Sequence, residues 1–174
     1  MATPQYDSTA TFCSSATHYI MTAAEIQFIK AEAAFRKGDK PTAFAAFKQG
    51  ISLHMDFCGV TAANKTAYLT SVALPQAAAD LKMSDIMQQK YVAMYGLGVI
   101  ETWVDMRRFQ YDPAIYTTFT TPVGTQFYPA NNGLLAYRVR PRYNSEYVWN
   151  LKSLATFGAD KADYHTYKPW FVNP

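Results

Sequence analysis

Two helix signals separated by one short turn, between residues 22 and 57, constrain the fold more than any other feature. Thr22, followed three residues later by Glu25, forms a capping box that predicts a helix start, because each side chain can pair with an N–H group of the first turn. Gly38 is a typical residue just beyond a helix end, so this helix is predicted to stop near Lys37. A second helix follows, with Asp39 as its cap.

Apolar residues at helical spacing predict that these two helices pack against each other. In the first helix, the predicted apolar stripe consists of Ile26, Ile29, Ala33 and Phe35. In the second helix, which Pro41 is suited to start, the apolar positions are Ala43, Phe44, Phe47, Ile51 and Leu53. Glu32 and Arg36 lie four residues apart, a spacing at which they are predicted to form an ion pair.

The run from Arg36 to Ile51 resembles a tetratricopeptide hairpin, with Gly38, Ala43, Phe47 and Gly50 at the positions of the turn glycine, small residues and aromatic ring. Small residues let two antiparallel helices approach while the ring fills the groove between them. Lys30 departs from the repeat pattern, and no second copy follows at a 34-residue period. Because one hairpin cannot bury its own face, an exposed apolar patch or self-association is expected.

The remaining sequence predicts a mainly α fold within a single region, residues 1–174. The connector 61–82 contains a short helix near residues 64–70, and Ser84 or Asp85 is predicted to cap a long helix over 84–110. Its apolar stripe includes Ile86, Tyr91, Met94 and Tyr95. Gly96 and Gly98 weaken its middle, which predicts one kinked helix or two. Residues 111–174 lack lasting periodicity and predict an irregular, aromatic-rich tail.

Composition argues for a globular chain and against several functions. Apolar residues make up 49% of the chain, enough for a core, while the formal charge is only +3 and is spread along the sequence. Basic residues cluster only at 107–108 and at 138–142, which is little for a nucleic-acid binder. The start has no basic and apolar regions of a secretion signal, and no apolar run approaches the ~20 residues that span a bilayer.

No catalytic or metal centre is recognisable. Glu101 and Asp105 are four residues apart on a predicted helix and could act as a glycosidic acid and base, but the neighbouring Arg107 and Arg108 favour an ion-pair cluster. The three histidines, His18, His54 and His165, do not have the spacing of metal ligands. No cofactor is expected. Cys13 and Cys58 are interpreted as thiols in preference to a disulfide, which stays an open alternative.

Aromatic residues concentrate in the segment that follows residue 110. Tyr111, Tyr116, Phe119 and Tyr128 lie among prolines and threonines. Aromatic faces on loops can stack on the apolar faces of sugar rings, so these four residues are the candidate ligand-binding residues. The alternative is that the rings cover the helical core.

Three ordered segments resemble the SusD/RagB family of outer-membrane lipoproteins. Gln89 to Pro113 is similar to the family's signature helix, with its Q-K-x-x-A and E-x-W-x-D-x-R-R elements. Arg138 to Asn150 is similar to its arginine-rich segment, although Asn144 replaces a proline. The close, Gly158 to Phe171, resembles its G-x-D and K-x-W-W elements, with Phe171 in place of the second Trp.

The resemblance, over roughly residues 18–174, implies the C-terminal part of a family member, whose helical fold contains several tetratricopeptide hairpins. Further hairpins, a signal peptide and a lipid-bearing cysteine are then expected upstream, since Cys13 lacks a lipobox. The implied function is capture of a glycan or other nutrient at the outer-membrane surface. The ligand would pass to a TonB-dependent, SusC-like transporter, without catalysis. Under this resemblance, Glu101, Trp103, Asp105 and Arg107 are expected to hold the helices and the following segment together.

Two other functions remain open on the sequence alone. The hairpin is also typical of a protein-interaction scaffold. A glycoside hydrolase would rest only on Glu101 and Asp105, and would be removed by finding them buried against arginines.

Overall fold

The computed structural model describes residues 19–172, and this part of the chain consists of helices and loops without a β-strand. The predicted helical class is therefore confirmed. The chain divides into two compact units, which follow one another in sequence at Val99 and Ile100.

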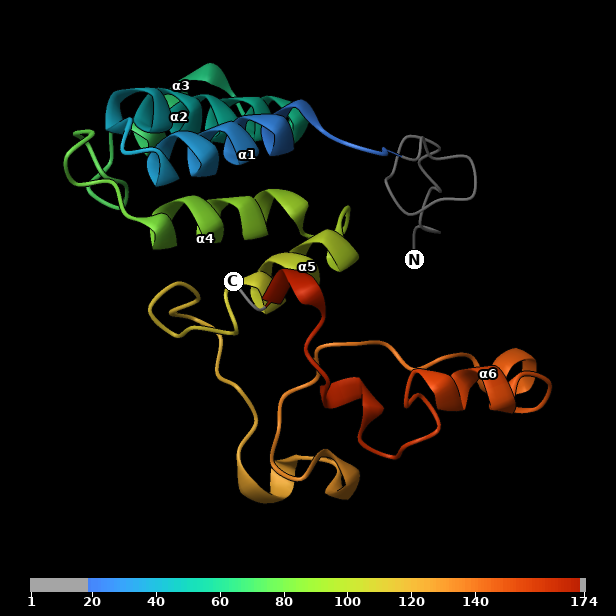
Figure 1. The fold of residues 1–174 in the computed structure, drawn as a ribbon. Helices are drawn as coiled ribbons and strands as arrows, with labels where there is room; N and C mark the ends of the chain where they lie inside the picture. The colour runs from blue at the N-terminus through green and yellow to red at the C-terminus, as the bar shows by residue number, and fades with distance from the viewer. Residues whose placement is uncertain (1–18, 173–174) are drawn as a thin grey trace, which may run out of the picture. The chain divides into compact units, whose positions relative to one another are not determined.

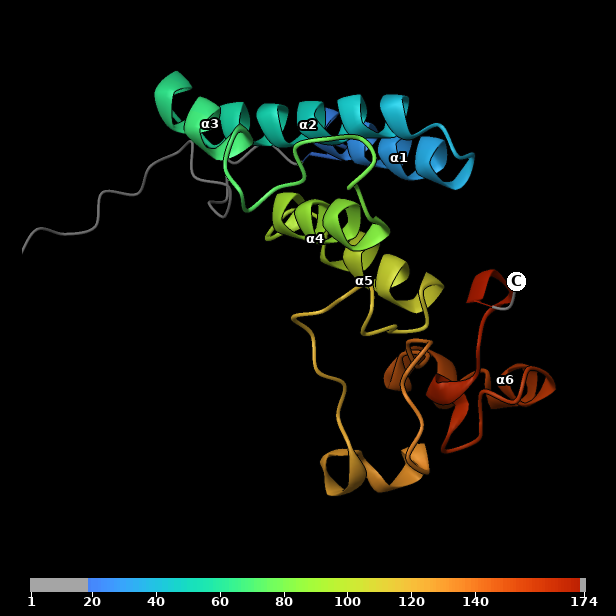
Figure 2. The same ribbon diagram turned by 90° about the vertical axis from the view of Figure 1, so that its left-hand side faces the viewer.

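Four helices form the first unit (Figures 1 and 2): α1 (Ala23–Arg36), α2 (Lys40–Phe57), α3 (Ala62–Leu69) and α4 (Met83–Met94). Helices α1 and α2 lie side by side as a hairpin, and α1 also packs against α4. Helix α3 lies against α2. The core of this unit is therefore centred on α1.

Local capping places the hairpin where the sequence predicts it. The Thr22 hydroxyl accepts a hydrogen bond from the Glu25 backbone N–H at 3.1 Å, and the Asp39 carboxylate accepts one from the Thr42 N–H, also at 3.1 Å. Gly38 has φ +80°, a conformation that a residue with a Cβ adopts only with strain. The predicted start, turn and second start are all confirmed.

Close approach of α1 and α2 depends on one glycine. The rings of Phe28 and Phe47 meet edge to face with their centroids 6.5 Å apart. Gly50 lies beneath the Phe28 ring, and a Cβ at this position would be 3.0 Å from its nearest carbon. Phe47 and Gly50 are both buried, as the tetratricopeptide pattern predicts.

The predicted apolar stripe of the first helix is wrong. Ile26 and Ile29 are 51% and 43% exposed. The buried face of α1 instead contains Ala24, Phe28 and Ala31. Small alanines bring the backbones together and leave room for one large ring, so they form a closer contact than two branched isoleucines would. The isoleucines consequently give the hairpin an exposed apolar face.

The start of α4 also differs from the prediction. The helix is capped at Lys82, and the Asp85 carboxylate accepts a hydrogen bond from the Lys82 backbone N–H at 2.8 Å. Neither Ser84 nor Asp85 is the cap, because an acidic side chain in the first turn can satisfy the preceding N–H groups from inside the helix.

The long predicted helix is two helices. Helix α4 ends at Met94, Gly96 follows with φ +76°, and α5 spans Val99–Arg108. Ile86 and Met94 are buried as predicted, but Tyr91 and Tyr95 are 44% and 80% exposed. The predicted stripe, which also continues through Ile100 and Met106, is therefore right at Ile86, Met94 and Met106 and wrong at the two tyrosines and at Ile100, which is 62% exposed.

The second unit begins within α5 and continues through loops with short helices. These are η1 (Gly124–Gln126), η2 (Pro129–Asn131), η3 (Tyr143–Tyr147), α6 (Leu151–Thr156), η4 (Tyr164–Thr166) and η5 (Trp170–Val172). The irregular tail is largely as predicted, although α6, which packs on η3, was not. Among residues 19–172, no helix is both long and apolar enough to cross a bilayer.

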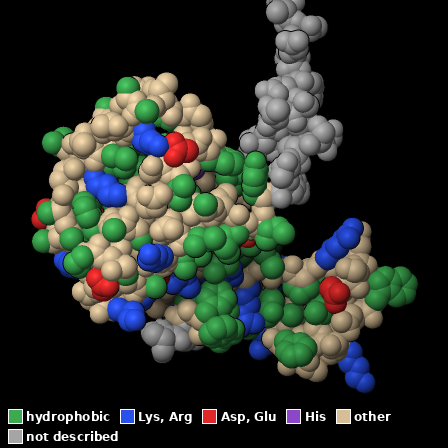
Figure 3. Space-filling view, turned by 90° about the horizontal axis from the view of Figure 1, so that it is seen from above, with side chains coloured by type: hydrophobic (Ala, Val, Ile, Leu, Met, Phe, Trp, Pro, Cys, Tyr) green, Lys and Arg blue, Asp and Glu red, His purple; other side chains and the backbone are tan. Residues whose placement is uncertain are grey.

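Large hydrophobic side chains are exposed at many points on the described surface. On the face that Figure 3 shows, hydrophobic side chains of all sizes appear in green. On the hairpin the large exposed side chains include Ile26 and Ile29, so the exposed apolar face expected of a single hairpin is present. In the second unit Trp149 and Trp170 are 83% and 86% exposed.

Candidate functional site

The base of the candidate site is a short chain of hydrogen bonds that starts on α5. Trp103 donates from Nε1 to the Tyr111 hydroxyl oxygen at 2.7 Å. The same hydroxyl donates to the Ala136 carbonyl oxygen at 2.5 Å. The helix, the segment after it and a loop 25 residues further on are thus joined through one phenol.

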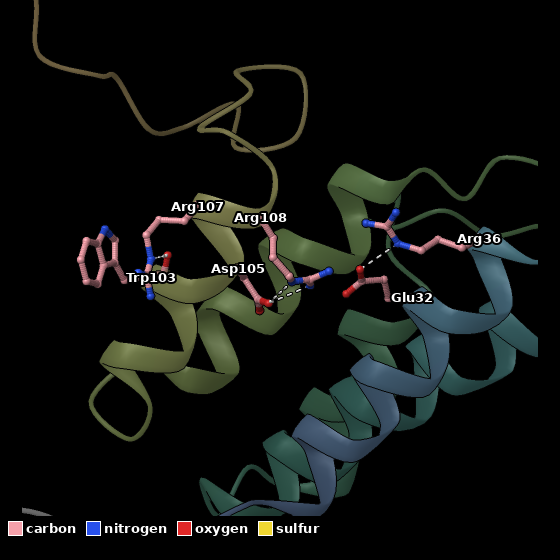
Figure 4. Close-up of polar contacts among 6 residues, drawn as sticks. All are labelled: Glu32, Arg36, Trp103, Asp105, Arg107 and Arg108. Carbon is pink, nitrogen blue, oxygen red and sulfur yellow. Dashed lines mark hydrogen bonds and ion pairs between the residues drawn. The ribbon is translucent and has the colours of Figure 1, made fainter. Parts of the chain in front are cut away.

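Arg107 fastens the same loop to α5 by a second route. Figure 4 shows Arg107 beside Trp103 on this helix. Its Nη1 donates to the Tyr137 carbonyl oxygen at 2.7 Å, and its guanidinium carbon lies 3.8 Å from the centroid of a Trp103 ring. Phe171 approaches the same guanidinium with its centroid 5.2 Å away. Burial lowers the pKa of the Arg107 guanidinium, which stays charged at neutral pH. Trp103 and Arg107 therefore hold the segments together, as the family resemblance implies.

Asp105 forms an ion pair and is not placed for catalysis. It is 6% exposed, and its carboxylate accepts from Arg108 Nη2 at 2.8 Å, as Figure 4 shows. Glu101 is exposed. A buried carboxylate that is engaged by an arginine is not open to a ligand, so the structure argues against the hydrolase alternative. The predicted pair of Glu32 and Arg36 on α1 is also present, at 2.9 Å.

A pocket of about 340 Å³ opens next to this hydrogen-bonded base. We call it the aromatic pocket, and its main walls are Trp103, Tyr111, Phe119, Phe127, Tyr128 and Asn131. It lies entirely within the second unit. The residues come from α5, from the loop that follows it and from the turn at η2.

The structure brings three of the four candidate ligand-binding residues together. Tyr111 is 8% exposed and forms the floor, stacked on Phe119 with centroids 6.2 Å apart and planes 27° apart. Phe119 and Tyr128 are 41% and 69% exposed and offer open ring surface. Tyr116 does not line the pocket: it is 4% exposed and packs edge-on against Phe109 at 6.3 Å.

Burial of Tyr111 has an electrostatic consequence. It raises the pKa of the Tyr111 phenol, and the hydrogen bond from Trp103 opposes this shift in part. Neighbouring Tyr137, whose ring meets Tyr111 edge-on at 5.5 Å, also has its phenol pKa raised by burial. Both hydroxyl groups are therefore neutral hydrogen-bonding groups over the physiological range.

Two carboxamides supply the polar part of the pocket, and sequence reasoning missed both. Gln126 accepts a hydrogen bond from the Val123 N–H at 2.9 Å through Oε1. Asn131 is 9% exposed and donates through Nδ2 to the Leu134 carbonyl oxygen at 3.2 Å. In sequence, Asn131 belongs to a proline, asparagine and glycine run that indicates only a turn.

The remaining candidate groups lie outside the pocket. Cys58 is a free, exposed thiol whose Sγ is 3.6 Å from His54 Nε2, and burial lowers the pKa of that imidazole. Cys13 and His18 lie outside the described residues, so the question of a disulfide stays open. Within the described range, no three His, Cys, Asp or Glu side chains gather as a metal site would require.

Comparison with known proteins gives one match. A protein-family model of the SusD-like type, described as "Starch-binding associating with outer membrane", matches residues 2–132. The match includes α5 and most of the aromatic pocket, but the segments 138–150 and 158–171 lie beyond its end. Searches among curated proteins and among solved structures gave no match. Because the family match covers most of the chain, the protein belongs to the SusD-like family of non-catalytic binding proteins, whose name associates it with the outer membrane.

Proposed function

We propose that the protein binds a glycan or other nutrient at the cell surface, in the aromatic pocket, for delivery to a TonB-dependent outer-membrane transporter. The observation that carries this proposal is the pair of open rings, Phe119 and Tyr128, above a buried floor at Tyr111. No reaction on the ligand is part of the proposal.

The shape of the pocket suits a sugar. The C–H faces of a pyranose are apolar and slightly positive, and they stack on aromatic rings, whose faces are negative. A volume of about 340 Å³ is at the small end of the ~300–1,000 Å³ typical of small-molecule sites. One or two rings of a longer glycan therefore fit better than an entire oligosaccharide.

The chemistry of the walls favours a neutral ligand. Of the described residues that line the pocket, none carries a charged side chain. The carboxamides of Gln126 and Asn131 are neutral groups that can hydrogen-bond sugar hydroxyls. A uronate or sulfate group would lose water on entering the pocket without gaining an opposite charge. We therefore expect neutral saccharides to bind in preference to acidic ones.

Calorimetric titration tests this proposal. Matched panels of neutral oligosaccharides, including starch-type glucans, and of uronate-containing ones are titrated into the wild-type protein. The same titrations are made with Phe119→Ala and Tyr128→Ala. We expect each substitution to weaken neutral-ligand binding roughly 10-fold, because each removes one stacking surface.

Trp149→Ala is the matched control, because Trp149 is 83% exposed and is not a pocket residue. It is expected to leave binding unchanged. Equal losses in all three variants, or binding that Phe119→Ala and Tyr128→Ala leave intact, would contradict a site in this pocket. No binding of any saccharide in either panel would contradict the glycan proposal.

Delivery to a transporter is a separate part of the proposal, supported by the family's association with the outer membrane. The test is affinity capture from detergent-solubilised outer membranes of the native host. We expect a TonB-dependent transporter to be recovered with the protein in amounts close to one to one. Absence of a transporter from the captured material, under conditions that preserve known transporter complexes, would contradict delivery to a transporter.

The alternative is a protein-interaction scaffold, favoured by the exposed face of α1 at Ile26 and Ile29. The substitution pair Ile26→Gln and Ile29→Gln separates the two functions. Loss of partner capture in a protein that binds no saccharide would favour the scaffold, whereas saccharide binding and partner capture that both stay unchanged would argue against a scaffold role of this face.

A further inference from the structure

We propose that His165 is a positioning residue for the aromatic pocket: as the neutral Nε2–H tautomer it fixes the Asn131 carboxamide so that one Nδ2–H is presented to a ligand hydroxyl. The inference rests on the proposed function and adds a specificity-determining polar contact to it. His165 lies in η4 (Tyr164–Thr166), 34 residues from Asn131 at the end of η2.

The orientation of Asn131 follows from its neighbours. Asn131 Nδ2 is 3.2 Å from the Leu134 carbonyl oxygen, which only accepts hydrogen bonds. Rotating the carboxamide by 180° would place Oδ1 against that carbonyl, two acceptors facing each other. Nδ2 therefore faces Leu134, and Oδ1 faces His165 Nε2 at 2.6 Å.

The tautomer of His165 follows from both of its ring nitrogens. Because Oδ1 of Asn131 only accepts, Nε2 must carry the proton. On the other side, Nδ1 is 3.5 Å from Arg140 Nη1, and a guanidinium only donates. Nδ1 is therefore the acceptor. The contacts of both ring nitrogens thus require the same tautomer, with the proton on Nε2.

Arg140 is itself held by several hydrogen bonds, so its contact with His165 Nδ1 has a fixed position. It donates to the carbonyl oxygens of Lys161 and Ala162 and to the Tyr147 hydroxyl, at 3.1, 2.5 and 3.1 Å respectively. The backbone carbonyl of His165 also accepts from the Tyr137 N–H at 2.7 Å. The imidazole is thus held by its backbone and by Arg140.

The consequence for the ligand concerns the second hydrogen on Asn131 Nδ2. One Nδ2–H donates to Leu134, and Oδ1 is occupied by His165, while the side chain is 9% exposed and lines the pocket. A sugar hydroxyl oxygen that accepts the second Nδ2–H finds a donor whose direction is already fixed, so little orientational freedom is lost on binding. A sugar epimer that turns this hydroxyl away loses the bond.

Nitrogen-15 NMR of the histidine rings reads the tautomer in the wild-type protein, and a variant is needed only to assign the signals. Two-bond couplings distinguish a ring that carries its proton on Nε2 from one that carries it on Nδ1, and the signal set that is lost in the His165→Gln protein belongs to His165. We expect the Nε2–H form. A predominant Nδ1–H form would overturn the inference while leaving the proposed function intact.

A pair of substitutions tests the effect on binding. In His165→Gln, the amide nitrogen falls close to the position of imidazole Nε2 and can still donate to Asn131. In His165→Asn, the shorter amide falls close to Nδ1 and reaches only toward Arg140. We expect His165→Asn to weaken saccharide binding roughly 3- to 10-fold, the worth of one hydrogen bond, and His165→Gln to bind within about 2-fold of wild type.

Equal binding by the two variants would overturn the inference, as would binding by His165→Asn at the wild-type level. Circular dichroism and thermal unfolding establish that both are folded. If the wild-type protein bound no saccharide, the proposed function would fail, and the ligand contact inferred for Asn131 would fail with it. The NMR result would then still decide the orientation of Asn131 separately.

Discussion

Tyr111 is the residue on which most of the aromatic pocket depends. Its hydroxyl accepts from Trp103 and donates to Ala136, and its ring supports Phe119. Its ring is largely buried, so its part in the proposed site is to support Phe119. Phe119 and Tyr128 remain the two rings with open faces.

The substitution Tyr111→Phe tests this role. It keeps the ring and leaves the Trp103 N–H and the Ala136 carbonyl without their hydroxyl partner. We expect the free energy of unfolding to fall by about 1–3 kcal/mol, the usual cost of unpaired buried polar groups. Urea denaturation measures it. Tyr143→Phe, at a tyrosine that is 71% exposed, is the control and should change stability by less than about 0.5 kcal/mol.

Alkaline pH gives a second residue-level prediction. Burial raises the pKa of Tyr111 in the folded chain, above its unfolded value of about 10. The folded state therefore holds its proton more tightly, and this contribution to stability is complete below about pH 10 and is lost as the pH rises through the folded-state pKa. Between about pH 8 and 11, wild type should lose more stability than Tyr111→Phe. Identical losses of stability in the two proteins would show that the Tyr111 hydroxyl does not cause this pH dependence.

At the scale of elements, the α1–α2 hairpin is limited by the space beneath Phe28. Gly50→Val introduces side-chain carbons where a Cβ alone would be 3.0 Å from a ring that is 1% exposed. We expect destabilisation of about 1–3 kcal/mol through overpacking. The same change at Ala45, exposed on α2, is the control. Thermal unfolding measures the stability of both variants. Destabilisation by Ala45→Val equal to or greater than that by Gly50→Val would contradict overpacking beneath Phe28.

Hairpin boundaries were predictable because capping is local. Thr22 and Asp39 each bond to an N–H three residues away, and Gly38 needs a positive φ at the turn itself. The buried face of α1 was not predictable in the same way. Hydropathy ranks Ile26 and Ile29 above alanine, whereas packing against α2 favours small residues around Phe28.

The aromatic pocket was predictable only in part, for a related reason. An irregular segment has no period, so sequence spacing does not tell which rings face inward. Phe119 and Tyr128 are open to solvent, but Tyr116 is buried against Phe109. The polar partners depend on contacts between distant segments, such as Asn131 with His165, which no local pattern encodes.

At the scale of the whole chain, the second unit is held together by side chains that reach from α5 into the C-terminal segment. Arg107 bonds to the Tyr137 carbonyl and contacts Phe171, and Lys168 bonds to Gln110 at 2.7 Å. Among described residues this unit has no strand and only short helices after α5, so these contacts take the place of regular backbone pairing. The family's signature helix is thus a structural anchor beside the proposed site.

Removing one anchor tests this account. Arg107→Leu removes the buried guanidinium and leaves the Tyr137 carbonyl oxygen without its hydrogen-bond donor. We expect a loss of about 1.5–3 kcal/mol, the usual worth of a hydrogen bond to a charged group. Hydrogen exchange should also accelerate in residues 136–138. The control is Arg142→Leu, at an exposed arginine, which should affect neither. Unchanged exchange in Arg107→Leu would contradict the anchoring role.

A neutral saccharide that stacks on Phe119 and Tyr128 in the aromatic pocket would place its C–H protons against these two rings. Nuclear Overhauser effects between sugar C–H protons and assigned ring protons measure this contact directly in the saturated complex. We expect cross-peaks to Phe119 and Tyr128, and none to Tyr143 or Trp149, which are at least as exposed but lie outside the pocket. Cross-peaks confined to Tyr143 and Trp149, or spread evenly over all exposed rings, would contradict it.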